Sequence, residues 1–266
     1  MTSMWDAAAL TLLAISGLLY LTGAIRRRAR GAVYRRWEPL AFALGWSALV
    51  TAVAPPIDIM ATQLFSIHMV QHELIMLIGA PLLIAGRPLP VILDGMSPGM
   101  RSATVALLQG RPGAAAWRTA TNPAVAWGAH GIVLWVWHVP ALYEWAVRNE
   151  GVHALQHAMF LATAALFWWG LLYGRYGRVG YGAAVFYVFT TVVHTGLLGA
   201  ALTLTGVPLY PGYIATSHRH GVDALADQQL AGIIMWVPAG FILTLLGLAL
   251  FAAWLGESER RAEAWK

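Results

Sequence analysis

The chain alternates between long apolar stretches and short polar connections. Seven of the stretches are apolar over about the 20 residues that a helix needs to cross a bilayer. We expect them to be helical, because lipid offers the backbone no hydrogen-bond partner. The pattern predicts an all-α polytopic membrane protein with one membrane domain, residues 1–266. Its seven transmembrane helices are expected over residues 4–25, 38–56, 64–86, 122–140, 151–173, 182–205 and 227–255.

The composition supports a membrane protein. Charged residues make up 11% of the chain, against roughly 25% in soluble domains, and 59% of the residues are hydrophobic. So few charges do not cover a water-soluble surface of this size. The chain has no cysteine, which excludes disulfides and thiolate metal sites.

The basic residues predict the orientation. In the seven-helix topology all of them except Arg148 and Arg219 fall on one side. By the positive-inside rule that side is cytoplasmic, so the N-terminus is expected outside and the C-terminus inside. The positive-inside rule also explains the basic net charge, so we do not expect nucleic acid as a partner. The cluster from Arg26 to Arg30 follows the first apolar stretch, which we therefore expect to remain as an anchor. The connection over residues 87–121 is predicted to hold a short interfacial helix between Pro98 and Gly110.

Two segments carry pairs of histidines four residues apart, HMVQH at 68–72 and HALQH at 153–157. Residues four apart share one face of a helix, one turn from each other. Both pairs fall in the predicted outer halves of their spans, where polar side chains are rare and usually functional. A single histidine there is more often an interhelical hydrogen-bonding residue, but two matched pairs favour a bound metal or cofactor. We therefore predict a site formed by His68, His72, His153 and His157.

The neighbouring side chains favour copper as the metal. Methionines, Met235 among them, are expected near the same outer halves, and thioether with imidazole suits Cu(I). Zinc held by histidines and Asp227, and haem with paired axial histidines, are the weaker alternatives. Asp227 can equally cap the last helix, whose N-terminal end favours a carboxylate.

Two other functions stay open at this point. The same histidines could serve a haem-binding electron carrier or another membrane oxidoreductase. A metal transporter is the second alternative, although the histidines thin out toward the cytoplasmic half, where His130 and His194 are the remaining steps. A retinal protein is excluded, because the only lysine, Lys266, lies in the tail.

Four blocks of the sequence stand out, namely HMVQHELIMLIGAPLLIAGRP, WHVPALYEWAVRNEGVHALQHAMFLATAALFWW, LYPGY and DQQLAGIIMW. Together they resemble the CtaG-type cytochrome c oxidase assembly factors of bacteria. The resemblance covers about residues 64–240. One position departs from it, since Gln156 stands where many relatives are expected to have an acidic residue.

The resemblance implies a multi-pass protein of the bacterial cytoplasmic (inner) membrane that assists oxidase maturation and is not itself an enzyme. It implies a copper chaperone role, with cytochrome c oxidase subunits as partners and membrane lipid as surroundings; a homo-oligomer is left open. It adds His138, Asp227 and Met235 to the predicted metal site, because they stand in the matching blocks.

Overall fold

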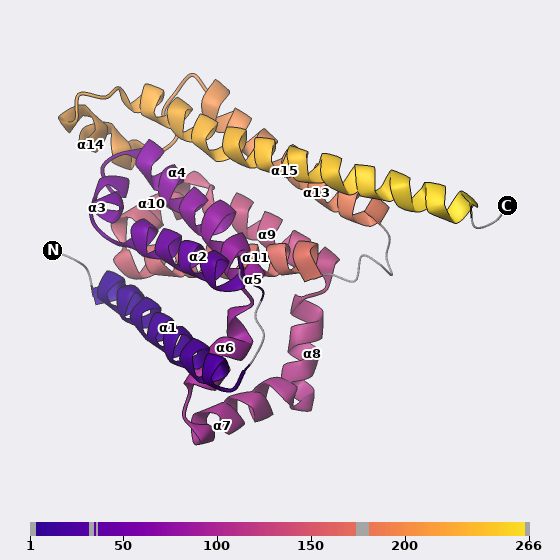
Figure 1. Cartoon of the computed structure of the whole chain (residues 1–266). Helices are drawn as coiled ribbons and strands as arrows, with labels where there is room; N and C mark the ends of the chain where they lie inside the picture. Colours follow the sequence, from indigo (N-terminus) through magenta and orange to yellow (C-terminus); the bar gives the residue numbers. More distant parts are fainter. Residues whose placement is uncertain (1–3, 32–34, 36, 174–180, 264–266) are drawn as a thin grey trace.

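The computed structural model describes residues 4–31, 35, 37–173 and 181–263, and within these ranges every regular element is a helix (Figure 1). The all-α prediction is therefore confirmed. The N-terminal half contains α1 (Met4–Ala29), α2 (Trp37–Val53), α3 (Ile57–Ala61), α4 (Phe65–Glu73), η1 (Leu74–Gly79), α5 (Ala80–Ala85), α6 (Pro88–Gly95), α7 (Pro98–Gln109) and α8 (Arg111–Ala120). The C-terminal half contains α9 (Pro123–Trp137), α10 (Pro140–Arg148), α11 (Glu150–Tyr173), α13 (Tyr181–Leu204), η2 (Pro211–Tyr213), α14 (Ile214–Arg219) and α15 (Ala224–Glu263).

Helices occupy all seven ranges that were predicted to cross the membrane. Five are long and apolar enough to do so: α1, the continuous run Phe65–Ala85, α11, α13 and α15. The pair α9 and α10 passes the same test only as one span bent by 76°, and α2 is shorter, with 17 residues. Within the described residues, five to six helices are thus able to span a membrane. A seventh span and the orientation of the termini stay predictions.

The third predicted span changes its helical form midway. It begins as α4, continues through the π-helical turn η1, and ends as α5. Pro81 stands in the first turn of α5 and has no backbone N–H to donate to the preceding turn. A π-helical segment inside an α-helix often accompanies a functional site. Here it directly follows the helix that carries His68 and His72.

Glycines allow two helix pairs to approach closely. A Cβ at Gly23 of α1 would lie 1.8 Å from the carbonyl oxygen of Val91 in α6, and one at Gly95 would lie 2.0 Å from that of Leu19. The pair α13 and α15, which run side by side in Figure 1, meets in the same way at Gly232 beside Thr203. Small residues at such crossings are typical of helices that pack within a membrane.

The outer surface of the bundle is apolar. Large hydrophobic side chains point outward on several long helices, with Phe186 68% exposed, Leu204 81% and Phe241 66%. A soluble monomer rarely shows a continuous apolar surface of this extent. The surface is that of a protein surrounded by lipid.

The connection between the third and fourth predicted spans holds three helices. The helix predicted between Pro98 and Gly110 is confirmed as α7, whose N-terminus is capped by the Ser97 hydroxyl, 3.4 Å from the backbone N–H of Met100. Neither α7 nor α8 buries a residue; α7 lies beyond the end of α1, and α8 leads from it back toward α9 (Figure 1). Their place at a membrane interface stays a prediction.

Candidate metal centre

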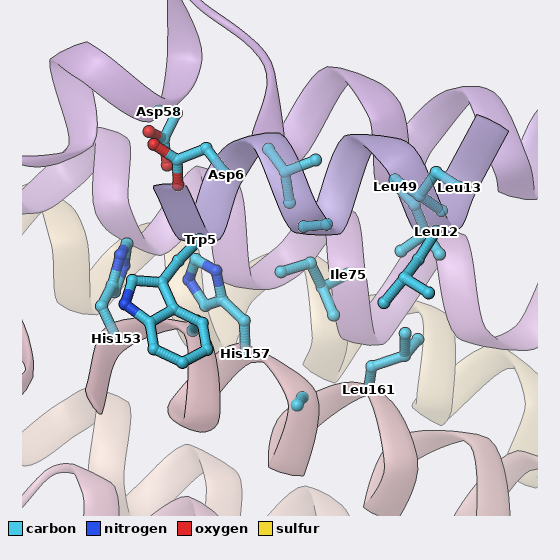
Figure 2. Close-up of a pocket in the computed structure, with 14 residues that line it drawn as sticks. Trp5, Asp6, Leu12, Leu13, Leu49, Asp58, Ile75, His153, His157 and Leu161 are labelled. Atoms are coloured by element: carbon cyan, nitrogen blue, oxygen red, sulfur yellow. The ribbon is translucent and has the colours of Figure 1, made fainter. Parts of the chain in front are cut away.

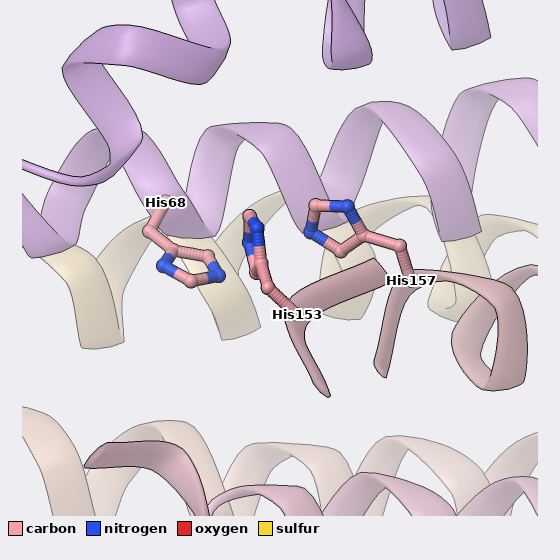
Figure 3. A group of neighbouring side chains, drawn as sticks. All are labelled: His68, His153 and His157. Atoms are coloured by element: carbon pink, nitrogen blue, oxygen red, sulfur yellow. The ribbon is translucent and has the colours of Figure 1, made fainter. Parts of the chain in front are cut away.

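Three histidines from two helices form a compact group of nitrogen atoms. His68 comes from α4, while His153 and His157 come from α11, and one ring nitrogen of each lies within 4.8 Å of the others (Figure 3). The Nε2 atoms of all three are buried and have no hydrogen-bond partner. Three imidazoles that each bring a ring nitrogen to this separation, and that each have an unpartnered Nε2, could bind one metal ion.

The spacing of four residues places the paired rings together on each helix. The ring centroids of His153 and His157 are 4.1 Å apart, and those of His68 and His72 are 4.4 Å apart. Between the helices, the His68 ring lies 5.0 Å from that of His153, and the His72 ring lies 5.4 Å from that of His157. The structure therefore brings the four histidines predicted from the two segments into one cluster.

A tyrosine fixes the His68 ring. The Tyr213 hydroxyl donates its proton to the carbonyl oxygen of Ala61 at 3.0 Å, and lies 2.7 Å from Nδ1 of His68. Because that proton is already used, the hydroxyl accepts the hydrogen of Nδ1–H. The Nε2 lone pair of His68 is then free to bind a metal. Partners of this kind are common behind metal-binding histidines.

His138 is oriented in the same way. Its Nδ1–H donates to the carbonyl oxygen of Leu134 at 2.7 Å, which leaves the buried Nε2 without a partner. Its ring centroid is 6.4 Å from that of His72, whose two ring nitrogens are both buried and unpartnered. Buried polar atoms without a partner are uncommon in proteins and need an explanation such as a bound ion. His72 and His138 extend the cluster by two further imidazoles.

Aromatic side chains enclose the cluster. Tyr143 and Phe160 are fully buried, with their ring centroids 5.1 Å from His68 and 4.7 Å from His72 respectively. Because these buried rings exclude water from around His68 and His72, the imidazoles lie in a medium of low polarity, in which electrostatic interactions are strong.

A cavity of about 230 Å³ opens beside the cluster. His153 and His157 form part of its wall, and Trp5, Asp6 and Asp58 line the end near the start of α1 (Figure 2). Burial raises the pKa of Asp58 above its ordinary value. Two carboxyl groups and two histidines of the cluster thus share the wall of one cavity.

Two other predicted ligands lie in different surroundings. The carboxylate of Asp227 accepts the backbone N–H groups of Phe65 and Ser66, at 2.6 and 3.2 Å, at the start of α4. Met235 lines a separate cavity of about 50 Å³ together with Glu73 and His130. Neither residue belongs to the three-histidine group.

The role of Tyr213 could not be predicted from the sequence. This tyrosine ends the LYPGY block, one of the four blocks that carry the family resemblance. No local pattern indicates that its hydroxyl reaches a histidine 145 residues away. The remaining histidines do not join the cluster. His130 lies in α9 and His194 lies in α13, whereas His218 and His220 are exposed around the end of α14.

Comparisons with known proteins identify the family. The family described as cytochrome c oxidase caa3 assembly factor (Caa3_CtaG) matches residues 18–257. An uncharacterized protein of Mycobacterium leprae is 25% identical over 258 residues, which is 93% of this chain and 38% of the relative. An uncharacterized protein of Mycobacterium bovis is 25% identical over 253 residues, or 91% of this chain and 38% of the relative.

The chain spans less than two fifths of the length of these curated relatives. No solved structure matches it. The family match covers most of the chain, including α4, α11 and the loop that holds Tyr213. This protein belongs to the family of cytochrome c oxidase caa3 assembly factors.

Proposed function

We propose that the protein holds copper during assembly of cytochrome c oxidase and passes it to an oxidase subunit. The observation that carries the proposal is the grouping of His68, His153 and His157, which each bring one ring nitrogen within 4.8 Å of the others and each have an unpartnered Nε2. Imidazole is a good ligand for copper, and the family supplies the link to the oxidase.

The donor set suits a cargo that must be released again. Three neutral imidazoles hold Cu(I) without changing its single positive charge, and they leave a coordination position to which a ligand of the recipient could bind. His72 and His138 stand next to the three-histidine group, so the ion would have alternative ligands during transfer. The chain itself carries out no covalent chemistry in this scheme.

The cavity beside the cluster supports an access route. A cation would pass the carboxyl groups of Asp6 and Asp58, then meet His153 and His157 in the same cavity wall (Figure 2). Carboxylates attract a cation, but imidazoles bind copper more tightly than carboxylates do. The order of the groups along the cavity therefore suits capture of the ion followed by its retention. By the positive-inside rule, this end of the molecule faces the outside of the cytoplasmic membrane.

Copper loading of the purified protein tests the proposal. The protein in detergent is titrated with Cu(I) against a coloured Cu(I) chelator, and X-ray absorption at the copper edge reports the ligands. We expect one tightly held ion per chain with a shell of nitrogen neighbours. His153→Ala/His157→Ala should lower the affinity at least about 100-fold, because two of the three ligands are lost.

His218→Ala/His220→Ala is the matched control, since it removes two exposed histidines outside the cluster. It should bind copper like the wild type. Equal copper in both double variants would overturn the site. An intense Soret absorption band in the purified protein would instead favour haem as the ligand of these histidines.

The link to the oxidase needs a separate measurement. Oxidase isolated from cells that carry His153→Ala/His157→Ala in place of the wild-type protein should contain less copper per haem. Normal copper in that oxidase would show that the protein assists assembly without delivering the metal.

A further inference from the structure

Three arginines surround one carboxylate near the C-terminal end of α1, and a fourth binds the backbone beside it. The Asp94 carboxylate at the end of α6 lies 3.2 Å from Nε of Arg27, 3.8 Å from a guanidinium nitrogen of Arg30 and 3.0 Å from one of Arg101 in α7. Arg26 donates from Nη1 to three backbone carbonyls, those of residues 94, 95 and 96, at 2.9 to 3.2 Å. A carbonyl accepts a hydrogen bond but cancels no charge. The four arginines and the Asp94 carboxylate together therefore carry a net charge of about +3.

The cluster surrounds an open cavity. The cavity has a volume of about 550 Å³ and is lined by Arg26, Arg30, Asp94 and Arg101, together with Pro98 and Ser102 of α7. The side chain of Asp94 is only 10% exposed, whereas those of Arg30 and Arg101 are 62% and 50% exposed. The carboxylate is thus largely covered, and two guanidinium groups keep donors for an incoming anion.

The start of α7 adds to the positive potential. This helix has 12 residues and begins at Pro98, in the wall of the cavity. Pro98 has no N–H group and the N–H of Met100 is capped by Ser97, so α7 contributes mainly the positive end of its helix dipole, which favours an anion. Guanidinium groups bind phosphate through charge-assisted hydrogen bonds, often two at a time.

Met96 and Val105 belong to the wall of the cavity, and further apolar side chains are exposed on the helices that carry the arginines. On α1, Leu18, Leu21 and Ile25 are 63%, 57% and 61% exposed in the turns that precede Arg26. On α7, Leu107 is 74% exposed. A free phosphate ion makes no use of such surfaces, whereas the acyl chains of a phospholipid would lie along them while its phosphate entered the arginine cluster.

We propose that this cavity binds the phosphate group of an anionic glycerophospholipid. The lipid joins α1 to α6 and α7 at the arginine-rich end of the molecule, which lies in the negatively charged leaflet if that end is cytoplasmic. The site is separate from the histidine cluster and does not depend on copper.

Native mass spectrometry of the detergent-purified protein tests the proposal. The protein is titrated with phosphatidylglycerol, with zwitterionic phosphatidylcholine and, in a third arm, with inorganic phosphate as competitor. We expect phosphatidylglycerol to bind in preference to phosphatidylcholine and to resist millimolar phosphate. Arg30→Gln/Arg101→Gln should weaken phosphatidylglycerol binding about 30-fold and leave phosphatidylcholine binding unchanged.

Arg111→Gln/Arg118→Gln is the matched control, because it removes two arginines from α8, outside the cavity. Arg30→Lys/Arg101→Lys keeps the charge but loses the forked donor geometry, so it should bind with intermediate affinity and also shows that the double substitution is tolerated. Equal binding of the two lipids, equal loss in the α8 control, or displacement by inorganic phosphate alone would each overturn the proposal.

Discussion

Single side chains around the cluster decide which ring nitrogens are free to bind a metal. Nδ1 of His138 donates to a backbone carbonyl, and Nδ1 of His68 donates to a tyrosine hydroxyl that is itself held by Ala61. In both rings the hydrogen bond assigns the proton to Nδ1 and leaves Nε2 as the donor to a metal. The metal affinity should therefore depend on residues that never touch the ion.

Removal of the Tyr213 hydroxyl tests this dependence. Tyr213→Phe takes away the partner of His68 Nδ1 and frees the ring to rotate, so we expect Cu(I) affinity to fall about 10- to 100-fold in a chelator competition titration. Tyr187→Phe is the control, since that hydroxyl donates to the carbonyl of Phe167 at 3.2 Å, away from the cluster. An unchanged affinity in Tyr213→Phe would contradict the role of the hydrogen bond.

Asp58, beside the cavity, should make the stability of the protein depend on pH. Burial raises its pKa above the ordinary 3.8, the hydrogen bond from Gln71 opposes this, and the carboxylates of Asp6 and Glu150 add to it. A raised pKa in the folded state means that the contribution of Asp58 to stability is fully present below the unfolded pKa. That contribution is lost as the pH rises through the folded value.

We therefore expect Asp58→Asn, whose amide oxygen can still accept from Gln71, to melt at the wild-type temperature near pH 4. Above that pH the variant should become progressively more stable than the wild type. Thermal melting followed by circular dichroism between about pH 4 and pH 8 measures the difference. A difference that does not change with pH would contradict the assignment to Asp58.

Among the elements, α15 supports the start of α4. The first N–H groups of a helix have no partner within the helix itself. In α4 those of Phe65 and Ser66 are buried and donate to Asp227, which comes from the first turn of α15. The start of α4, one turn before His68, is thus capped by a residue 162 positions away from Phe65 in the sequence.

Asp227→Ala should destabilise the protein because it leaves two buried N–H groups unpaired. We expect a loss of about 1–3 kcal/mol in the free energy of unfolding, seen as a lower melting temperature. Asp223→Ala removes an exposed cap on the N–H of Ala226 and should lower the free energy of unfolding by less than Asp227→Ala does. Copper per chain should stay the same in both variants at a temperature where they are folded. Loss of copper from folded Asp227→Ala would instead restore Asp227 as a metal ligand.

At the scale of the whole molecule, a bound ion would join α4 to α11. An ion held by His68 together with His153 and His157 binds the folded state only, because the three nitrogens come together through folding. Copper should therefore stabilise the entire bundle and not merely the residues around it.

Addition of Cu(I) should raise the melting temperature of the apoprotein. At a free concentration of about 100 times the dissociation constant the gain is about 2.7 kcal/mol. A strong Cu(I) chelator should reverse the shift, and His153→Ala/His157→Ala should show little of it. A similar shift in wild type and variant would mean that copper acts elsewhere on the protein.

The helices could be located from the sequence because each depends on a local property, the apolar length that a bilayer requires. For the same reason the prediction of seven spans stays untested where composition alone is ambiguous. Helix α2 has 17 residues, and α9 and α10 meet at a bend of 76°, so among the described residues five to six helices are long and apolar enough to span a membrane. His138 and Val139 form the break between the two helices, and Pro140, which has no backbone N–H, begins the second of them.

The sequence by itself determined the all-helical architecture, the apolar outer surface and the pairing of histidines on one helix face, because these follow from periodicity within one segment. Only the tertiary structure decided that the face of α4 meets that of α11, that Tyr213 orients His68, and that Asp227 caps α4. Such contacts join residues up to 162 positions apart, and no local pattern encodes which helices become neighbours. They result from the packing of the whole bundle.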